Sequence, residues 1–358
     1  MAPDKPVDVM RATLVAIAPG TGLRDGLERI LRAQTGALVV LGDNAVVQQV
    51  SSSGFGIGED FSPQRLSELA KMDGAIVVSP DAAKIVRANV HLVPDPSIPT
   101  MESGTRHRTA ERVARQTGFP VVAVSQSMHI VTVYVDSQKW VLEDVTALLT
   151  RANQALQTLE RYKQRLTEVA SNLLALEVED QATLRDAVTV VQRIEMVGRI
   201  ASEVEALVVE LGTEGRLMRL QLEELMGGVE TERRMLVRDH IAQKRMRSFD
   251  AVLSELAALS PEDLLDPIAI ARALGYPASP ESLDVASSPR GYRILSKIPR
   301  LPTTVVERIV SAFGRLPKVM SASIDDLLAV EGVGAARASL VKDGLIRLAE
   351  SSILDRYL

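Results

Sequence analysis

The 358-residue sequence contains no cysteine. This absence excludes disulfide bridges, thiolate metal sites and cysteine nucleophiles, and it leads us to expect a reducing compartment, the cytoplasm. Aromatic residues make up only 3% of the chain, so aliphatic side chains must fill the cores. No apolar run approaches the ~18 residues that a membrane-spanning helix needs, so we expect no membrane association. The net charge of -5 argues against a uniformly basic surface for nucleic acid, although it leaves room for a local basic patch.

The chain contains three regions with different residue patterns. Hydrophobic residues make up 46% of it, which is typical of globular proteins, and its length suffices for two or three domains. Residues 1–145 alternate short valine- and isoleucine-rich runs with amphipathic segments, which predicts an α/β domain with a mixed sheet. Residues 146–285 predict a helical spine, and residues 286–358 predict a compact helical module. We therefore expect a multidomain protein in which an α/β domain precedes all-α regions.

Short apolar runs in the first region, each bounded by glycine, proline or polar residues, predict strands. They are residues 37–41, 46–50, 74–79, 121–125 and 129–135. Amphipathic segments predict helices at residues 23–34, 62–72, 81–88 and 106–117. The glycine-rich stretch GFGIGEDF, residues 54–61, lacks the Lys-Ser/Thr ending of a P-loop, and we expect a loop there.

The second region has apolar residues at helical spacing and no proline before Pro261. Glycines at 212–215 and 227–228 predict breaks between helices that pack as a bundle. Its many Glu and Arg residues fit a solvated face, with contact between subunits as the alternative. Proline and serine between residues 275 and 290 predict a linker.

The third region carries the sequence LLAVEGVGAARASLV, residues 327–341. Gly332 and Gly334 flank Val333 between two predicted helices, so the backbone can turn sharply while Val333 points inward. The N–H groups at the start of the next helix, with Lys342 on that helix, could then contact a phosphate. This resembles a helix-hairpin-helix motif, which binds DNA backbone without reading sequence. An ordinary tight connection between helices is the alternative, and residues 298–316 resemble a degenerate partner hairpin.

In the first region, the segment SGTRHRTAERVARQTG places Arg106, His107 and Arg108 in the first turn of a predicted helix. Cations oppose the helix dipole there unless an anion is bound. The N–H groups, the two guanidinium groups and the neighbouring threonine hydroxyls therefore predict a polyphosphate site. Arg112 and Arg115, further along, are explained as a solvated face.

A second element is Asp73-Gly74, which enters the buried strand predicted at 74–79. On its own, Asp-Gly is a common turn. Together with the basic segment, it supplies a carboxylate for Mg²⁺ beside a cationic phosphate site, and nucleotidyl transfer needs both.

The pair of motifs, MDGA followed by GTRHRTA and preceded by FSPQRLSELAK, resembles the diadenylate cyclase family. The order of cyclase domain, helical spine and helix-hairpin-helix end is similar to the DNA-scanning branch of that family over essentially the whole chain. The closeness of the match implies an actinobacterial member.

The resemblance implies that two ATP molecules are joined into cyclic di-AMP with release of two pyrophosphates. Two cyclase domains must then meet face to face, and the family implies a homo-octamer organised by the spine. It further implies a Mg²⁺ cofactor, with Mn²⁺ as the alternative, and inhibition of the cyclase by branched DNA. A DNA-binding scaffold with a nucleotide-sensing but non-catalytic domain is the rival hypothesis, and the presence of both motifs favours the enzyme.

The resemblance also assigns roles to single residues. Asp73 would bind the metal and position the attacking hydroxyl, while Ser125 would add a phosphate contact. Gln126 follows Ser125 where many relatives have an acidic residue, so no second metal carboxylate is expected there. His107 is either a general base or a phosphate contact. Contacts to ribose, adenine and triphosphate are implied for Gly74, Ala75, Leu92, Thr105, Arg106, His107, Arg108 and Thr109.

Overall fold

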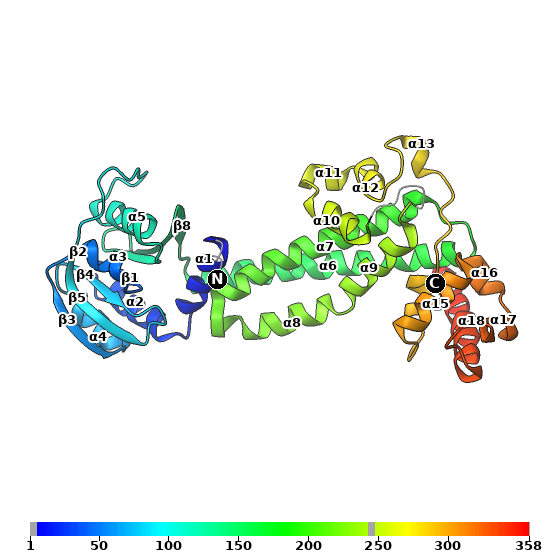
Figure 1. Ribbon diagram of the computed structural model, residues 1–358, viewed down its shortest axis with the longest axis horizontal. Helices are drawn as coiled ribbons and strands as arrows, with labels where there is room; N and C mark the ends of the chain where they lie inside the picture. Colours follow the sequence, from blue (N-terminus) through cyan, green and yellow to red (C-terminus); the bar gives the residue numbers. More distant parts are fainter. Residues whose placement is uncertain (1–5, 243–247, 358) are drawn as a thin grey trace. The chain divides into compact units, whose positions relative to one another are not determined.

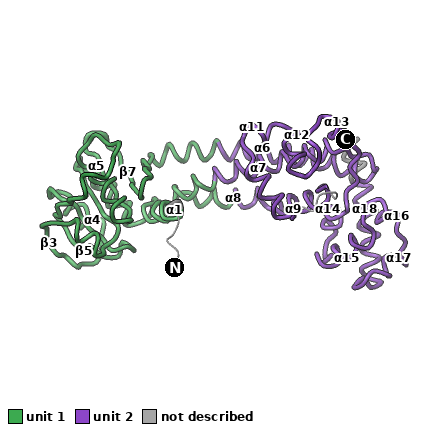
Figure 2. The backbone as a smooth tube through the Cα atoms, turned by 45° about the horizontal axis from the view of Figure 1, so that its top comes forward, with its two compact units in different colours: residues 1–154, 205–220 green, residues 155–204, 221–358 purple. Residues whose placement is uncertain are grey.

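The computed structural model describes residues 6–242 and 248–357. Two units emerge from the contacts between residues, and Figure 2 distinguishes them by colour. The first unit consists of residues 1–154 and 205–220, and the second consists of residues 155–204 and 221–358.

An eight-stranded mixed sheet forms the centre of the first unit (Figure 1). Its strands are β1 (Ala37–Leu41), β2 (Ser51–Ser52), β3 (Phe55–Asp60), β4 (Ala75–Val78), β5 (Lys84–Leu92), β6 (Val121–Ser125), β7 (Ile130–Val135) and β8 (Gln138–Val141). The order along the sheet is β2-β5-β4-β1-β6-β7-β8, with β3 paired to β5. β1 and β4 are parallel, whereas the other named pairs are antiparallel.

Helices cover both faces of this sheet, because successive side chains in its central strands point to opposite sides. Val39 of β1 belongs to one apolar cluster and Val40 belongs to the other. The first cluster includes buried residues from α1 (Pro6–Ala16), α2 (Gly22–Arg32) and α4 (Pro63–Leu69). The second includes buried residues from α3 (Ala45–Gln49) and α5 (Thr105–Thr117). The mixed α/β fold predicted for this region is confirmed, with a three-layer arrangement.

Three local predictions for this unit are wrong. Residues 46–50 are mostly helical, because Asn44 caps α3 by accepting from the Val47 N–H at 2.9 Å. Residues 81–88 lie largely in β5, where burial follows the strand alternation with bulges against β4. Residues 54–61, expected as a loop, contain the whole of β3, whose side chains are mostly exposed while its backbone pairs with β5.

The second region is helical, as predicted, with breaks at the expected glycines. Its helices are α6 (Val145–Val178), α7 (Leu184–Leu211), the 3₁₀ turn Gly212–Gly215, α8 (Arg216–Met226), α9 (Val229–His240), α10 (Phe249–Ala258), α11 (Pro261–Leu265), α12 (Pro267–Ala273) and α13 (Pro280–Leu283). The segment 275–290, predicted as a linker, is bound to the connection between α6 and α7. Ser287 N–H donates to the Ala182 carbonyl at 2.8 Å, and Leu184 N–H donates to the Val285 carbonyl at 3.0 Å.

The carboxy-terminal helices pack around one apolar cluster that also includes Leu174 of α6. They are α14 (Tyr292–Ser296), α15 (Thr303–Phe313), α16 (Leu316–Ser321), α17 (Ile324–Leu328) and α18 (Ala335–Tyr357). The shared cluster shows that these helices are packed against the spine within the second unit.

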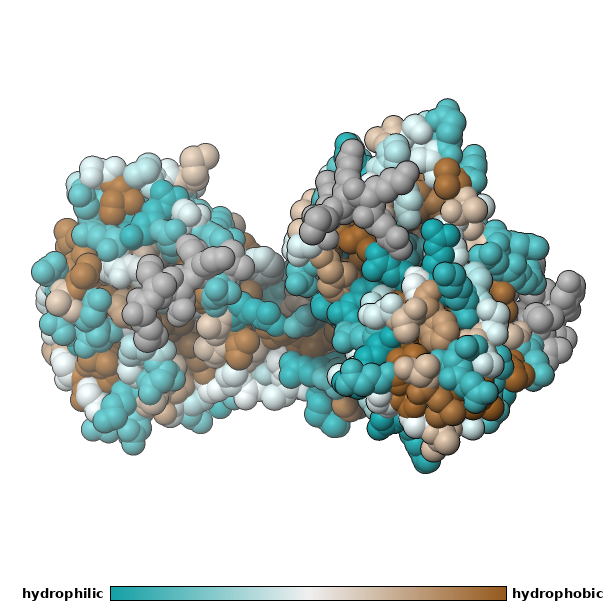
Figure 3. Space-filling model, turned by 45° about the vertical axis from the view of Figure 1, so that its right-hand side comes forward, coloured by the Kyte–Doolittle hydropathy of each residue, from teal (hydrophilic) through white to brown (hydrophobic). Residues whose placement is uncertain are grey.

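The visible surface is mostly hydrophilic, with smaller apolar patches between polar residues (Figure 3). Among the described residues, no helix combines the length and the apolar character needed to cross a membrane.

Candidate active site

The two sequence motifs meet at one edge of the sheet. β4 begins at Ala75, which pairs with Leu38 near the start of the parallel strand β1. β6 ends at Ser125, and the preceding Val124 pairs with the first residue of β1. Because β1 and β4 begin at this edge and β6 ends there, Asp73 and Ser125 lie at the same edge of the sheet.

Strand β5 brings Leu92 to this edge and constrains Gly74. Ala75 pairs with a residue of β5 two positions before Leu92, so Leu92 lies beside the entrance of β4. A Cβ at Gly74 would lie 2.7 Å from the backbone of Asn89, a residue with φ of +52°. The side chains of Ala75 and Leu92 are buried in the core, at 2% and 7% exposure. A ligand could therefore reach these two residues through their backbone.

The first turn of α5 presents unpaired cations and uncapped N–H groups. Gly104 is the N-cap and supplies no side-chain hydrogen bond, and the turn holds no acidic residue. Thr105 and Arg106 are exposed, while Arg108 is half-buried. The ion pairs formed between residues of the described ranges include neither Arg106 nor Arg108. The turn therefore has the donors and the charge to hold an anion.

The later arginines of α5 have a different role from the predicted one. Arg112 Nε donates to the Ile98 carbonyl at 2.9 Å, and Arg115 Nη1 donates to the Pro99 carbonyl at 2.9 Å. Arg115 also pairs with the buried Glu111 at 2.6 Å. The prediction of a solvated face is wrong because the loop before α5 folds back over these side chains. They hold that loop in place next to the start of the helix.

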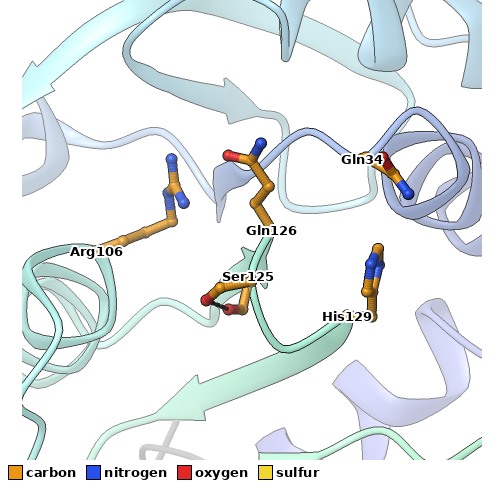
Figure 4. A pocket seen from close by; sticks show the side chains of 6 residues that line it. Gln34, Arg106, Ser125, Gln126 and His129 are labelled. Atoms are coloured by element: carbon orange, nitrogen blue, oxygen red, sulfur yellow. Dashed lines mark hydrogen bonds between the residues drawn. The ribbon is translucent and has the colours of Figure 1, made fainter.

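Arg106 and Ser125 line one cavity of about 470 Å³ (Figure 4). The Arg106 guanidinium lies against Gly36, where an added Cβ would be 2.2 Å from Nη1. Asp73 does not line this cavity. The other lining residues, for which the sequence predicts no ligand role, come from the turns beside β1 and β6: Gln34, Gln126, Ser127 and His129.

His107 belongs to a hydrogen-bonded chain that the sequence did not reveal. Its Nδ1 lies 2.9 Å from the Tyr134 hydroxyl, which donates to Glu102 Oε1 at 3.0 Å. Lys139 pairs with the same Glu102 oxygen at 2.6 Å. Burial lowers the pKa of His107, while the negative charge of Glu102 acts in the opposite sense. Tyr134 is 27 residues from His107 in the sequence, and the packing of α5 against β7 brings the two side chains together.

Asp73 suits a metal that is shared with a substrate. Its carboxylate is exposed, and no residue in the described ranges bonds to it. Nor do three or more His, Cys, Asp or Glu side chains gather there as a metal-binding group in those ranges. Mg²⁺ is commonly held by one or two carboxylates together with phosphate oxygens, so Asp73 fits such a site when a nucleotide supplies the remaining ligands.

At the other end of the chain, Gly332 adopts φ of +83° in the turn between α17 and α18. Val333 is 4% exposed and lies in the module's core, as predicted. A Cβ on Gly334 would meet no atom within 4 Å, so this position is open. Lys342 is committed elsewhere, because its ammonium donates to the carbonyls of Met320 and Ala322 at 3.2 and 2.8 Å.

Comparison with known proteins identifies the family. Residues 24–139 match the model of the DisA bacterial checkpoint controller nucleotide-binding region, and residues 142–283 match the model of the DisA linker region. The DNA integrity scanning protein DisA of Parafrankia sp. is 62% identical, over 98% of each chain. This chain belongs to the DisA family.

Other members of the DisA family agree with this assignment. The protein from Streptomyces coelicolor is 58% identical, over 98% of this chain and 94% of its own. Both sources are Actinobacteria, as the sequence predicts. The domain at residues 24–139 is thus a diadenylate cyclase domain. A crystal structure of a DacA double mutant from Staphylococcus aureus is similar with 21% identity and a TM-score of 0.30, over 37% of this chain and 88% of that one.

Proposed function

We propose that this DisA-family chain joins two ATP molecules into cyclic di-AMP at the sheet edge described above. Each 3'-hydroxyl attacks the α-phosphate of the other nucleotide, and each attack releases one pyrophosphate. The observation that carries the proposal is the first turn of α5, where Arg106 and Arg108 form no ion pair with the described residues and accompany uncapped N–H groups. Such a turn favours a polyanion, and the exposed carboxylate of Asp73 lies at the same edge.

The residues at this edge of the sheet have separate roles in binding and in the reaction. Arg106, Arg108 and the N–H groups of the turn hold the triphosphate and stabilise negative charge on the leaving pyrophosphate. Thr105, Thr109 and Ser125 add hydroxyl donors. Asp73 would hold Mg²⁺ together with the nucleotide, and the ion would supply positive charge next to the reacting phosphate. The backbone at Gly74, Ala75 and Leu92 faces the nucleoside.

The reaction requires a second copy of this edge. One first turn holds one triphosphate, whereas the product forms from two nucleotides that attack each other. Two chains related by a two-fold axis would place the nucleotides antiparallel. We propose a homo-oligomer with cyclase domains face to face, and an octamer as the family resemblance implies.

For the carboxy-terminal module, we propose sequence-independent binding of DNA backbone at the turn of Gly332, Val333 and Gly334. The open position of Gly334 and the exposed start of α18 support it, because a phosphate needs close approach to N–H groups. Lys342 is not required as a contact, since its ammonium is held by backbone carbonyls. Branched DNA is proposed to inhibit the cyclase.

Purified full-length protein with ATP and Mg²⁺ tests the enzyme against the scaffold alternative. Cyclic di-AMP and pyrophosphate in a ratio of one to two are expected by chromatography, and 3'-deoxy-ATP should give no product. Asp73→Asn should lose turnover without losing thermal stability. Asp43→Asn, after the opposite end of β1, is the matched control and should remain active. ATP that stays intact with the wild-type protein would favour the nucleotide-sensing scaffold.

A further inference from the structure

The hydrogen bonds around His107 determine which of its ring nitrogens carries a proton. The Tyr134 hydroxyl has one proton, and the geometry directs it to the carboxylate of Glu102. Tyr134 must then accept from His107, so the imidazole carries its proton on Nδ1. In the neutral ring, Nε2 is left with a lone pair and no proton.

Nε2 is buried and has no hydrogen-bond partner within the described residues. The charged groups that act on the ring come from different elements: Glu102 from the loop before α5, Lys139 from β8 and Arg106 from α5. Burial and the two cations lower the pKa of His107, whereas Glu102 raises it. The free protein therefore holds an imidazole whose pKa is lowered by burial, within a turn suited to phosphate.

We propose that Glu102 and Tyr134 are positioning residues that hold His107 in the Nδ1–H form, so that Nε2 takes up a proton from solvent when the triphosphate binds. The protonated Nε2 then donates to a phosphate oxygen. This inference rests on the proposed function, because it requires a nucleotide at the first turn of α5. It assigns His107 to the phosphate contact rather than to the general base.

The arrangement favours proton uptake for electrostatic reasons. A neutral Nε2 would direct its lone pair at a phosphate oxygen, which is repulsive, whereas the imidazolium donates to it. Tyr134 accepts the opposite N–H in both charge states, and the negative charge of Glu102 stabilises the imidazolium. The anion supplies the remaining stabilisation and raises the pKa of His107 on binding.

Calorimetric titration of full-length protein with 3'-deoxy-ATP and Mg²⁺ measures this proton directly. Repeating it near pH 7.5 in buffers of different ionisation enthalpy gives the protons taken up, and a substantial fraction of about one proton per site is expected. Affinity should fall as pH rises, by up to about tenfold per pH unit. Uptake of no proton would overturn the proposal.

Two variants separate the tautomer from the charge. Glu102→Gln keeps an oxygen that can accept from Tyr134 but removes the charge, so proton uptake should move to lower pH. Tyr134→Phe removes the acceptor for Nδ1–H, so the neutral ring can present Nε2–H, and the affinity should become nearly independent of pH. Tyr162→Phe, under Arg193 on the spine, is the matched control.

The outcomes distinguish this inference from a packing role and from the proposed function. One contrary result is that the variants weaken binding equally at every pH and leave proton uptake unchanged. That result would show that Glu102 and Tyr134 serve only in packing, and it would overturn the inference. Failure of the wild-type protein to bind 3'-deoxy-ATP or to turn over ATP would instead count against the proposed function.

Discussion

The first turn of α5 and the cluster around Arg293 in the second unit both contain arginine and histidine, but they differ in burial and in how many of these side chains are bonded within the protein. Arg293 is fully buried, with Nη2 paired to Glu177 and Nη1 bonded at 3.0 Å to Glu232. His240 of the same cluster uses both ring nitrogens, at 2.8 Å to Ser287 and 2.9 Å to Glu177. Arg106 is exposed without an ion-pair partner in the described ranges, and His107 uses one nitrogen of two.

The difference teaches how to separate structural from functional charges. A buried charge needs a partner within the protein, since desolvation otherwise makes it too costly. The Arg293 cluster meets that need, and it attaches α14 to α6 and α9. Asp239 accepts three N–H groups of residues 291–293 at 2.8 Å each. Charges gathered in a helix's first turn without a partner favour an external anion, and in the proposed function the anion at α5 is the triphosphate.

The largest expected effect is a loss of stability when Arg293 is removed from its buried cluster. Arg293→Met leaves Glu177 buried beside a partner that cannot neutralise it, so the free energy of unfolding should fall by about 3 to 5 kcal/mol. Urea denaturation of the full-length protein measures the loss. Arg185→Met removes an exposed pair with Asp284 and should cost less than about 1 kcal/mol. Equal losses in the two variants would contradict the distinction.

At the first turn of α5, a substitution should lower turnover and leave stability nearly unchanged. Arg106→Ala should lower kcat by about 100- to 1,000-fold, because a donor to the developing pyrophosphate charge is lost. Its unfolding free energy should change by less than about 0.5 kcal/mol, since the side chain is exposed. Steady-state kinetics and denaturation check both, with Arg32→Ala on α2 as the control. Loss of stability without loss of turnover would show that Arg106 is structural.

Two glycines at this edge of the sheet allow effects on turnover to be separated from effects on stability. Gly36→Ala would push against the flexible Arg106 guanidinium, so turnover should fall about 10- to 100-fold while stability changes little. Gly74→Ala would push against the Asn89 backbone, so stability should fall by about 1 to 3 kcal/mol. Thermal unfolding and steady-state kinetics on the same samples measure the stability and the turnover of each variant. Similar profiles for the two variants would refute the separate roles.

The smallest effects concern the carboxy-terminal module. Lys342→Met loses bonds to two carbonyls and should cost about 1 kcal/mol of stability while leaving DNA affinity unchanged. Gly334→Leu should leave stability unchanged and weaken DNA binding roughly tenfold or more, because it blocks close approach to the N–H groups. Fluorescence anisotropy with duplexes of two unrelated sequences measures both. Unaltered binding by Gly334→Leu would remove the proposed contact.

Much of the fold could be predicted because its signals are local. The buried face of α5, with Ala110, Val113 and Ala114, follows from helical spacing, and the strand at 121–125 follows from its apolar run. Residues 46–50 misled the prediction because valines in a short run suit either a strand or a helix. Burial of Val47 and Val50 on one side, with Asn44 as the cap, decided for the helix.

The candidate site was predictable to a similar extent. The sequence was enough to propose Asp73 and the Arg106–Arg108 segment as site residues, because each motif is contiguous and their pairing indicated the chemistry. Glu102, Tyr134 and Gly36 were missed because their importance lies in contacts with residues distant in the sequence. No spacing rule connects Tyr134 with His107.

The sequence by itself determined the class of each region, the two motifs and the cations that lack a local partner, because periodicity and helix-end electrostatics act over a few residues. The tertiary structure decided which charged side chains are bonded within the protein. Arg293 pairs within a buried cluster, Arg112 and Arg115 donate to carbonyls of a loop, and Lys342 donates to backbone carbonyls. The tertiary structure also decided that His107 contacts Tyr134. These outcomes depend on burial and on contacts between distant segments, which exist only once the sheet and the helices have packed.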